Sequence, residues 1–403
     1  MSQSNDISYN KKSVTDIPVS GKKILLRCDF NVPVDKETGV ITDEGRVTAA
    51  IPTIEYLMEQ GAAIIACSHF GRPKGEFNPK YSLAPVAECL SKHLGKPVKM
   101  SKDVIGPDAT ALAAGLRPGE IMLLENTRFH PEEEKNDPEF AKKLAGMADI
   151  FVSDAFGSVH RAHASTEGVS HYLPAVSGFL LKKELDQIGG AISDPKRPLV
   201  AILGGAKVSD KLGVIANLLK KADAIIIGGG MAYTFIKAAG GAIGQSLCED
   251  GEIDAVLEMK LEAEARGVKL LLPIDTVVAA EFSNDATPET VDSDAIPDDM
   301  MGLDIGRRSI DEFKKEIAGA GTIVWNGPMG VFEFSKFEKG TLEIANAVAG
   351  SGAISVIGGG DSAAAVRKFG LEDKITHIST GGGASLEFME GKILPGIACL
   401  LDA

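Results

Sequence analysis

The segment most informative about the fold is Ile225-Ile226-Ile227-Gly228-Gly229-Gly230, in which a β-rich apolar run passes through three glycines into a helical pattern. The same join recurs over 356–361 and 378–383, and 199–207 is a near copy. Glycine lets backbone N–H groups approach a ligand, and the positive end of the next helix lies at the same place. The repeated join therefore indicates cradles for an anion such as a nucleotide phosphate chain, or else merely tight turns between strand and helix.

Known nucleotide and hydrolase motifs do not match these joins. None fits G-x-x-x-x-G-K-[ST] or G-x-G-x-x-G, so neither a Walker P-loop nor a standard dinucleotide fingerprint is present. The run Gly360-Asp361-Ser362-Ala363-Ala364 lacks the last glycine of a nucleophile elbow, which argues against a serine hydrolase. Any phosphate site is therefore of another kind.

Composition restricts the class of protein. A chain of 403 residues with 44% hydrophobic residues should form about two domains. A net charge of −14 opposes binding to nucleic acid or to an anionic membrane, and no apolar run has membrane-spanning length. The five cysteines are widely spaced and form no C-x-x-C, which argues against disulfides and against a zinc site. We therefore expect a cytoplasmic protein.

Strand-like and helix-like segments alternate along the chain, which is typical of parallel α/β sheets covered by helices. Segment 181–198 is the best linker candidate, and acidic 284–299 indicates a surface excursion. The expected strands are 24–30, 62–68, 120–125, 149–154, 199–203, 224–227, 269–272, 322–325 and 354–357. The expected helices are 48–60, 83–94, one that follows Asp137 as N-cap, 212–221, 253–266 and 310–317.

Basic and polar residues follow the predicted strands of the first half. Ligands of open parallel sheets bind beyond the carboxyl ends of the strands, so these side chains should share one site. Several arginine forks together match a small acid that carries phosphate. The alternatives are solvated arginines and a structural His69, while His160 and His163 lack a third metal ligand at recognisable spacing. The residues at issue are Asp29, Asn31, Arg46, His69, Arg72, Arg128 and Arg161.

In the second half, Lys207 and Lys211 are four residues apart, so a helix there would point both toward a bound phosphate. They could equally be solvated. Asp361 directly follows a glycine triplet, where its carboxylate would either hold Mg²⁺ or cap the helix over 362–369.

Read together, these motifs closely resemble the phosphoglycerate kinase family, from about Val14 to the end of the chain. The segments that carry the resemblance are Arg27-Cys28-Asp29-Phe30-Asn31-Val32-Pro33, Ser68-His69-Phe70-Gly71-Arg72-Pro73, His160-Arg161-Ala162-His163, Gly204-Gly205-Ala206-Lys207-Val208-Ser209-Asp210-Lys211, Trp325-Asn326-Gly327-Pro328-Met329-Gly330-Val331-Phe332-Glu333 and Gly358-Gly359-Gly360-Asp361.

The resemblance implies two Rossmann-like α/β domains joined by a hinge, and a monomer. Residues 1–185 would bind 3-phosphoglycerate with the tail 394–403 packed back on them, 186–199 would be the hinge, and 200–393 would bind ATP or ADP with Mg²⁺. The implied reaction is reversible glycolytic phosphoryl transfer between 1,3-bisphosphoglycerate and ADP.

The resemblance also assigns site residues. The substrate residues are the seven named above. The implied nucleotide residues are Lys207, Lys211, Gly302, Asn326, Glu333, Gly359, Gly360, Asp361 and Ser362, with Glu333 on the ribose and Asp361 on Mg²⁺. The implied catalytic residues are Arg46, Lys207, Gly359 and Gly382.

The chain departs from the family pattern at an extension of about ten residues, within Met1–Lys12, where we expect disorder. It also has Phe70 in place of leucine, and Arg307 in place of a common proline near the expected nucleotide site. Two other functions remain open: a kinase that forms a different acyl phosphate, and a nucleotide- or phosphometabolite-binding protein without turnover.

Overall fold

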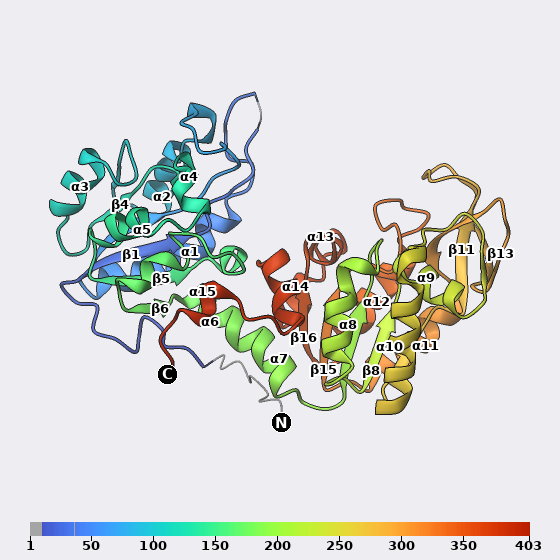
Figure 1. Cartoon of the computed structure of the whole chain (residues 1–403). Helices are drawn as coiled ribbons and strands as arrows, with labels where there is room; N and C mark the ends of the chain where they lie inside the picture. The colour runs from blue at the N-terminus through green and yellow to red at the C-terminus, as the bar shows by residue number, and fades with distance from the viewer. Residues whose placement is uncertain (1–9, 36) are drawn as a thin grey trace. The chain divides into compact units, whose positions relative to one another are not determined.

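The computed structural model describes residues 10–35 and 37–403 (Figure 1). These residues form two compact units. The first unit comprises the described residues up to Asp186 together with Ile393–Ala403, and the second comprises Gln187–Lys392. Each unit has a six-stranded parallel sheet with helices on its faces, so the predicted α/β class is confirmed.

The sheet of the first unit has the strand order β3-β4-β2-β1-β5-β6, with Leu25 of the central strand paired to Ile65 and Phe151. Its core strands β1, β2 and β5 are buried and mostly apolar because both faces of the sheet are covered, with Arg27 and Asp154 as buried charged exceptions. Strands β3 and β6, of three residues each, were not predicted, because Val-Lys-Met and Ala-Val-Ser lack the apolar run that indicated β4. The strands are β1 Lys23–Cys28, β2 Ala63–Cys67, β3 Val98–Met100, β4 Ile121–Leu123, β5 Ile150–Asp154 and β6 Ala175–Ser177.

Among the helices of the first unit, the prediction that Asp137 is an N-cap is confirmed, because its carboxylate accepts a 2.9 Å hydrogen bond from the Phe140 N–H group. The first helix begins at Gly45, three residues before the predicted start. The helices are α1 Gly45–Glu59, α2 Ala84–Leu94, α3 Pro107–Ala114, α4 Pro131–Glu134, α5 Pro138–Ala145, α6 Phe179–Glu184 and α15 Pro395–Ala398.

The second unit has a sheet of order β10-β8-β7-β15-β16-β17, in which Trp325 of β15 is completely buried. Its strands are β7 Leu199–Leu203, β8 Ala224–Ile227, β10 Lys269–Leu271, β15 Thr322–Asn326, β16 Ile354–Gly358 and β17 His377–Ile378. Its helices are α7 Gly190–Ser193, α8 Leu212–Leu218, α9 Met231–Ala238, α10 Ile253–Arg266, α11 Arg307–Ala318, α12 Lys339–Gly350, α13 Gly360–Lys368 and α14 Gly383–Met389.

A smaller antiparallel sheet, which was not predicted, also belongs to the second unit. It has the order β12-β11-β14, and a separate two-stranded pair joins β9 to β13. The segment 284–299 lies mostly at the surface, as predicted, but it contains strands β12 and β13, which were not predicted. The side chains of β12 are largely exposed, so the segment lacks an apolar face. The strands are β9 Ala242–Ile243, β11 Asp275–Ala279, β12 Glu289–Asp292, β13 Ala295–Ile296 and β14 Met301–Ile305.

The chain passes between the units through a helical segment. After α6, a π-helical turn over Leu185–Gly189 leads directly into α7, and the division between the units falls after Asp186. The non-helical part of the 181–198 segment is therefore confined to residues 194–198.

Both ends of the described chain lie beside strand β6 of the first unit. The Lys12 N–H group donates to the Leu401 carbonyl at 2.9 Å, and the Ser177 N–H group donates to the Lys12 carbonyl at 2.9 Å. Lys11 is 6% exposed and pairs with Asp402 at 2.7 Å. The expectation of disorder is thus wrong for residues 10–12, while its remainder lies outside the described residues. No described helix has the length and apolarity needed to cross a bilayer.

Candidate substrate and nucleotide sites

In the first unit, polar residues meet beyond the carboxyl ends of β1 and β2. Arg46, at the start of α1, pairs its Nη1 with Asp29 Oδ2 at 2.6 Å, and 44% of its side chain is exposed. The Gly71 N–H group donates to Asn31 Oδ1 at 2.8 Å, and the Gly71 carbonyl accepts from Arg128 Nη1 at 3.0 Å. The glycine loop after β2 thus holds an amide and a guanidinium close together.

The remaining predicted arginines differ in burial. Arg128 is 8% exposed and forms an ion pair with Glu134 at 3.3 Å. Arg161 is exposed and its Nε donates to His160 Nε2 at 3.1 Å, while Arg72 is exposed directly after Gly71. Arg72 and Arg161 are therefore accessible to a ligand, whereas Arg128 is held by the protein.

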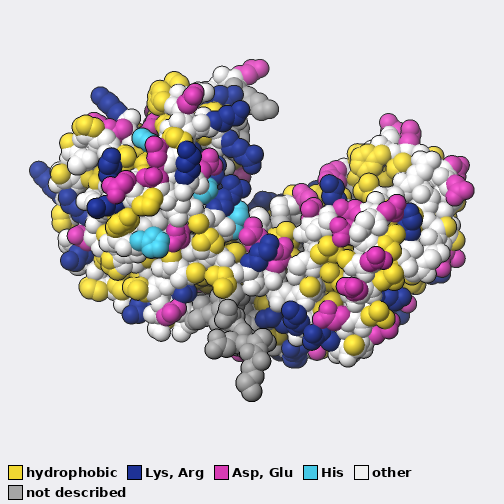
Figure 2. Space-filling model, viewed as in Figure 1, with side chains coloured by type: hydrophobic (Ala, Val, Ile, Leu, Met, Phe, Trp, Pro, Cys, Tyr) yellow, Lys and Arg dark blue, Asp and Glu magenta, His cyan; other side chains and the backbone are white. Residues whose placement is uncertain are grey.

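Electrostatic effects on two histidines show that the cations converge. Burial first, and then the charges of Arg27, Arg128 and Arg46, hold the pKa of His69 well below its ordinary value. Burial, Arg128, Arg27 and Arg161 lower the pKa of His163 to about 4. Both imidazoles are neutral at pH 7, so the guanidinium groups supply the positive charge. Figure 2 shows Lys and Arg side chains gathered with histidines along one edge of this unit.

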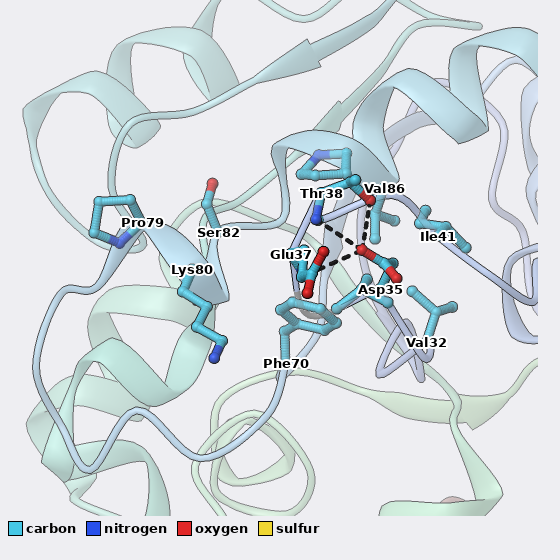
Figure 3. Close-up of a pocket in the computed structure, with 13 residues that line it drawn as sticks. Val32, Asp35, Glu37, Thr38, Ile41, Phe70, Pro79, Lys80, Ser82 and Val86 are labelled. Atoms are coloured by element: carbon cyan, nitrogen blue, oxygen red, sulfur yellow. Dashed lines mark hydrogen bonds between the residues drawn. The ribbon is translucent and has the colours of Figure 1, made fainter.

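A separate cavity of about 270 Å³ lies behind the 32–41 loop of the first unit (Figure 3). The ring of Phe70 lines it and meets Tyr81 edge to face, with 6.5 Å between the ring centroids. Asp35 Oδ1 accepts hydrogen bonds from Thr38. None of the predicted substrate residues lines this cavity. Phe70, which stands where the family usually has leucine, therefore affects packing in this cavity and does not line the predicted substrate site.

In the second unit, a cavity of about 430 Å³ lies at the carboxyl ends of β7, β15 and β16. Gly205 and Gly359 line it with φ of +108° and +91°, which glycine adopts readily. The triplet 228–230 does not line it: a Cβ on Gly229 would lie 2.7 Å from Gly205 backbone atoms, so glycine serves close packing there. The predicted residues that do line the cavity are Lys207, Lys211, Asn326, Gly359, Gly360, Asp361, Ser362 and Gly382.

The floor of this cavity is polar and buried. Lys211 Nζ donates to Asn326 Oδ1 at 2.5 Å, and burial lowers the pKa of Lys211. Asn326 is 3% exposed, and its Nδ2 has no hydrogen-bond partner among the described residues. Ser362 is fully buried, and its hydroxyl accepts the Gly327 N–H group at 2.5 Å. The amide of Asn326 is thus an unused donor, whereas Ser362 holds the neighbouring loop.

Asp361 is the second residue of α13, and the N-cap of that helix is Gly359. The alternative that Asp361 caps the helix is therefore wrong, and its exposed carboxylate lines the cavity. Gly302 and Glu333 do not line it. The Gly302 N–H group donates to Ser246 Oγ at 2.9 Å, and Glu333 is exposed on the loop that follows β15. Arg307 pairs with Asp311 on α11, also away from the cavity.

Comparison with known proteins agrees with this arrangement. A family model described as phosphoglycerate kinase matches residues 14–392. A phosphoglycerate kinase of Clostridium botulinum is 57% identical over 98% of this chain and 100% of that protein, and one of Chloroflexus aurantiacus is 54% identical with the same coverage. The solved phosphoglycerate kinase of Coxiella burnetii has a TM-score of 0.91 and 44% identity, covering 96% of this chain and 98% of that one. The chain belongs to the phosphoglycerate kinase family.

Membership of the phosphoglycerate kinase family confirms the predicted resemblance, enzyme class and reaction. The enzyme transfers a phosphoryl group between 1,3-bisphosphoglycerate and ADP, to give 3-phosphoglycerate and ATP. The alternatives of another acyl-phosphate kinase and of a binding protein without turnover are not supported.

One buried network of this phosphoglycerate kinase was missed in the sequence. Arg27 is 1% exposed, and it contacts His69 Nδ1 through Nη2 at 3.1 Å and Ser165 Oγ through Nε at 2.9 Å. Ser165 in turn donates its N–H group to the buried carboxylate of Glu133 at 3.0 Å. The signal was an arginine inside the apolar run Ile24–Cys28, where a solvated side chain does not fit.

Proposed function

We propose that the cavity of the second unit binds the phosphates of ATP or ADP, and that the basic cluster of the first unit binds 3-phosphoglycerate. The observation that carries the nucleotide site is the unpartnered Nδ2 of Asn326. A buried donor without a partner costs about 1 to 3 kcal/mol, and a phosphate oxygen would satisfy it. Lys207 and Lys211 supply charge to the same cavity.

Gly302 and Glu333 are proposed to lie toward the nucleoside end. The Val331 N–H group donates to the Leu303 carbonyl at 2.8 Å, so the loop that leaves the cavity at Gly327 runs alongside β14. A nucleotide with its phosphates at Lys207 could extend along this loop. Glu333 would then accept hydrogen bonds from the ribose.

In the first unit, the proposed ligand is an acid with a phosphate group. Arg72 and Arg161 are exposed and can close on the phosphate, while His69 and Asn31 orient the rest of the molecule. Asp29 holds Arg46 through an exposed ion pair, which is worth little and is easily exchanged for a substrate contact.

The chemistry proposed for these residues requires no general base. The nucleophile in the ATP-consuming direction is the carboxylate of 3-phosphoglycerate, whose unperturbed pKa is about 4. Catalysis then consists of in-line positioning and of neutralising charge on the transferring phosphoryl oxygens. We assign that role to Arg46, Lys207 and the N–H groups of Gly359 and Gly382.

Asp361 is proposed as the protein ligand of Mg²⁺. Its carboxylate is exposed in the first turn of α13 and lines the phosphate cavity, which suits an ion that is usually held by one or two carboxylates together with substrate phosphates. Bound there, Mg²⁺ would neutralise charge on the phosphate chain. Burial lowers the pKa of Lys211, and the charges of Asp210 and then Asp361 oppose that effect.

Because the proposed groups belong to different units, we propose that segment 186–199 is a hinge and that both substrates together favour closure, which excludes water from the acyl phosphate. Scattering without compaction on addition of both substrates would argue against closure.

We further propose that the enzyme is monomeric and cytoplasmic, as its acidic charge and unpaired cysteines suggest.

The deciding experiment measures ADP release from Mg-ATP by the purified chain with 3-phosphoglycerate or with glycerate, while hydroxylamine traps the acyl phosphate. We expect turnover with 3-phosphoglycerate only. Turnover with glycerate alone would refute the assignment of the arginines to a substrate phosphate. No turnover by folded, nucleotide-binding protein would refute the assignment of the catalytic residues.

A further inference from the structure

Three side chains with metal-binding atoms meet where α1 and α2 pack against each other in the first unit. Cys89 and His93 lie four residues apart on α2, so they share one face of the helix. Glu44 directly precedes α1, and its carboxylate makes no capping bond to that helix. Instead its Oε2 lies 2.7 Å from His93 Nε2, and the Cys89 thiol hydrogen-bonds to the same carboxylate.

The ligand atoms of these three residues all lie within 4.8 Å of one another. A tetrahedral zinc ion with bonds of about 2.0 to 2.3 Å holds its ligands about 3.3 to 3.6 Å apart. From these distances we propose that Glu44, Cys89 and His93 form a binding site for Zn²⁺ or a similar borderline-soft divalent ion, separate from the Mg²⁺ of the reaction.

The donor set favours this class of ion. A thiolate, an imidazole and a carboxylate are the three kinds of ligand that zinc takes, whereas Mg²⁺ prefers oxygen alone. Within the described chain, this is the one group of three or more such residues close enough to share an ion. Side-chain exposure of 29% for His93 and 41% for Glu44 leaves room for water at a fourth position.

Binding would need only local movement. The thiol proton of Cys89 passes to solvent as the S–metal bond forms. The proton between His93 and Glu44 leaves Nε2 as the imidazole takes its other neutral tautomer, with the proton on Nδ1, and the Nε2–Oε2 separation opens from 2.7 Å to about 3.4 Å. The cysteine pattern alone argued against zinc, because the third ligand, Glu44, directly precedes another helix and lies 45 residues before Cys89. The ion would join the start of α1 to the middle of α2.

The test uses the full chain, freed of metal by a chelator and without nucleotide or Mg²⁺. Titration with Co²⁺ is followed by its d–d absorption and by thiolate-to-cobalt charge-transfer absorption, and Zn²⁺ is then used to displace the Co²⁺. We expect one equivalent to bind with charge-transfer absorption that is lost in Cys89→Ser. In His93→Gln and Glu44→Gln the affinity for Co²⁺ should fall about tenfold or more, since the loss of a residue that only hydrogen-bonds to a metal ligand already lowers metal affinity by about that factor.

Matched controls exist for each part of the site. His171→Gln removes a histidine that also pairs with a carboxylate, Glu167, at 2.7 Å, but this pair forms no group of three ligand atoms within 4.8 Å with a cysteine. Cys248→Ser removes a cysteine whose thiol donates to Asp250 at 3.2 Å. Asp361→Asn changes the proposed Mg²⁺ ligand. All three should leave the Co²⁺ spectrum and affinity unchanged.

The proposal is overturned if Co²⁺ gives no charge-transfer absorption, or if that absorption persists in Cys89→Ser. It is also overturned if His93→Gln binds Co²⁺ as tightly as the parent chain. His93 is an exposed residue, so its replacement should fold normally, and circular dichroism checks that it does. None of these outcomes depends on phosphoryl-transfer activity.

Discussion

Lys211 Nζ donates a 2.5 Å hydrogen bond to Oδ1 of Asn326, and Nδ2 of the same buried amide has no partner in the described chain. The lysine therefore fixes which end of the amide accepts, and leaves the donor end for a ligand. Asn326 is the last residue of β15, so the sheet itself sets the position of its side-chain amide.

Replacing Asn326 with alanine should weaken ADP and ATP binding about tenfold, because one buried hydrogen bond worth about 1 to 2 kcal/mol is lost. Isothermal titration calorimetry measures the change. Asn217→Ala is the control, since Asn217 Nδ2 donates to the Met389 carbonyl and the residue does not line the cavity. Unchanged nucleotide affinity in Asn326→Ala would refute the assigned donor.

Replacing Arg46 with alanine should lower kcat by about 10² or more, with a smaller change in KM for 3-phosphoglycerate, because the guanidinium is assigned to charge that develops in the transition state. Steady-state kinetics test this. Arg266→Ala removes an arginine that is also 44% exposed and paired with a carboxylate, and it should have no effect. A raised KM with normal kcat would assign Arg46 to binding alone.

Replacing Arg27 with methionine should destabilise the first unit by about 3 to 5 kcal/mol, because the buried Glu133 carboxylate loses its nearby positive charge. Adding Glu133→Gln should restore part of that loss. Urea unfolding of the single and double variants measures both values. A double variant no more stable than Arg27→Met would show that the two charges are not coupled.

The buried carboxyl group of Asp304 should give the second unit an unusual dependence of stability on pH. Burial raises the pKa of its carboxyl to about 8 in the folded chain, against about 3.9 when unfolded. Between these values the folded state binds a proton that the unfolded state has released, so the free energy of unfolding contributed by this group falls as pH rises through that window.

Denaturant unfolding at several pH values should therefore show a flatter dependence on pH between about 4 and about 8 in Asp304→Asn than in the parent chain. Asp254→Asn, at an exposed position on α10, is the control. An identical pH profile for Asp304→Asn and the parent chain would mean that Asp304 is ionised in the folded protein.

Replacing Asp361 with asparagine should raise the Mg²⁺ concentration needed for half-maximal activity about tenfold or more, since one anionic ligand of the ion is lost. Activity measured against Mg²⁺ at constant ATP gives the value. Asp210→Asn changes another carboxylate that lines the cavity and should have little effect. The same Mg²⁺ dependence in Asp361→Asn and the parent enzyme would remove Asp361 from the metal site.

The local sequence was enough to predict elements whose environment is uniform. Strands β7 and β8 and helix α10 have the predicted bounds, because an apolar run buried on both faces, or a long uninterrupted helix, requires little information from elsewhere. Strands β3, β6 and β12 were missed because each is short or exposed, and only its neighbour in the sheet makes it a strand.

The sequence by itself determined the alternating α/β organisation and the family, and it supplied the glycines and arginines from which the site residues were predicted. Only the tertiary structure decided which groups meet. It placed Lys211 against Asn326, excluded the triplet 228–230 from the cavity, and buried Arg27 beside His69. Hydrogen bonds and burial depend on atoms from segments far apart in the chain, so no local pattern encodes them.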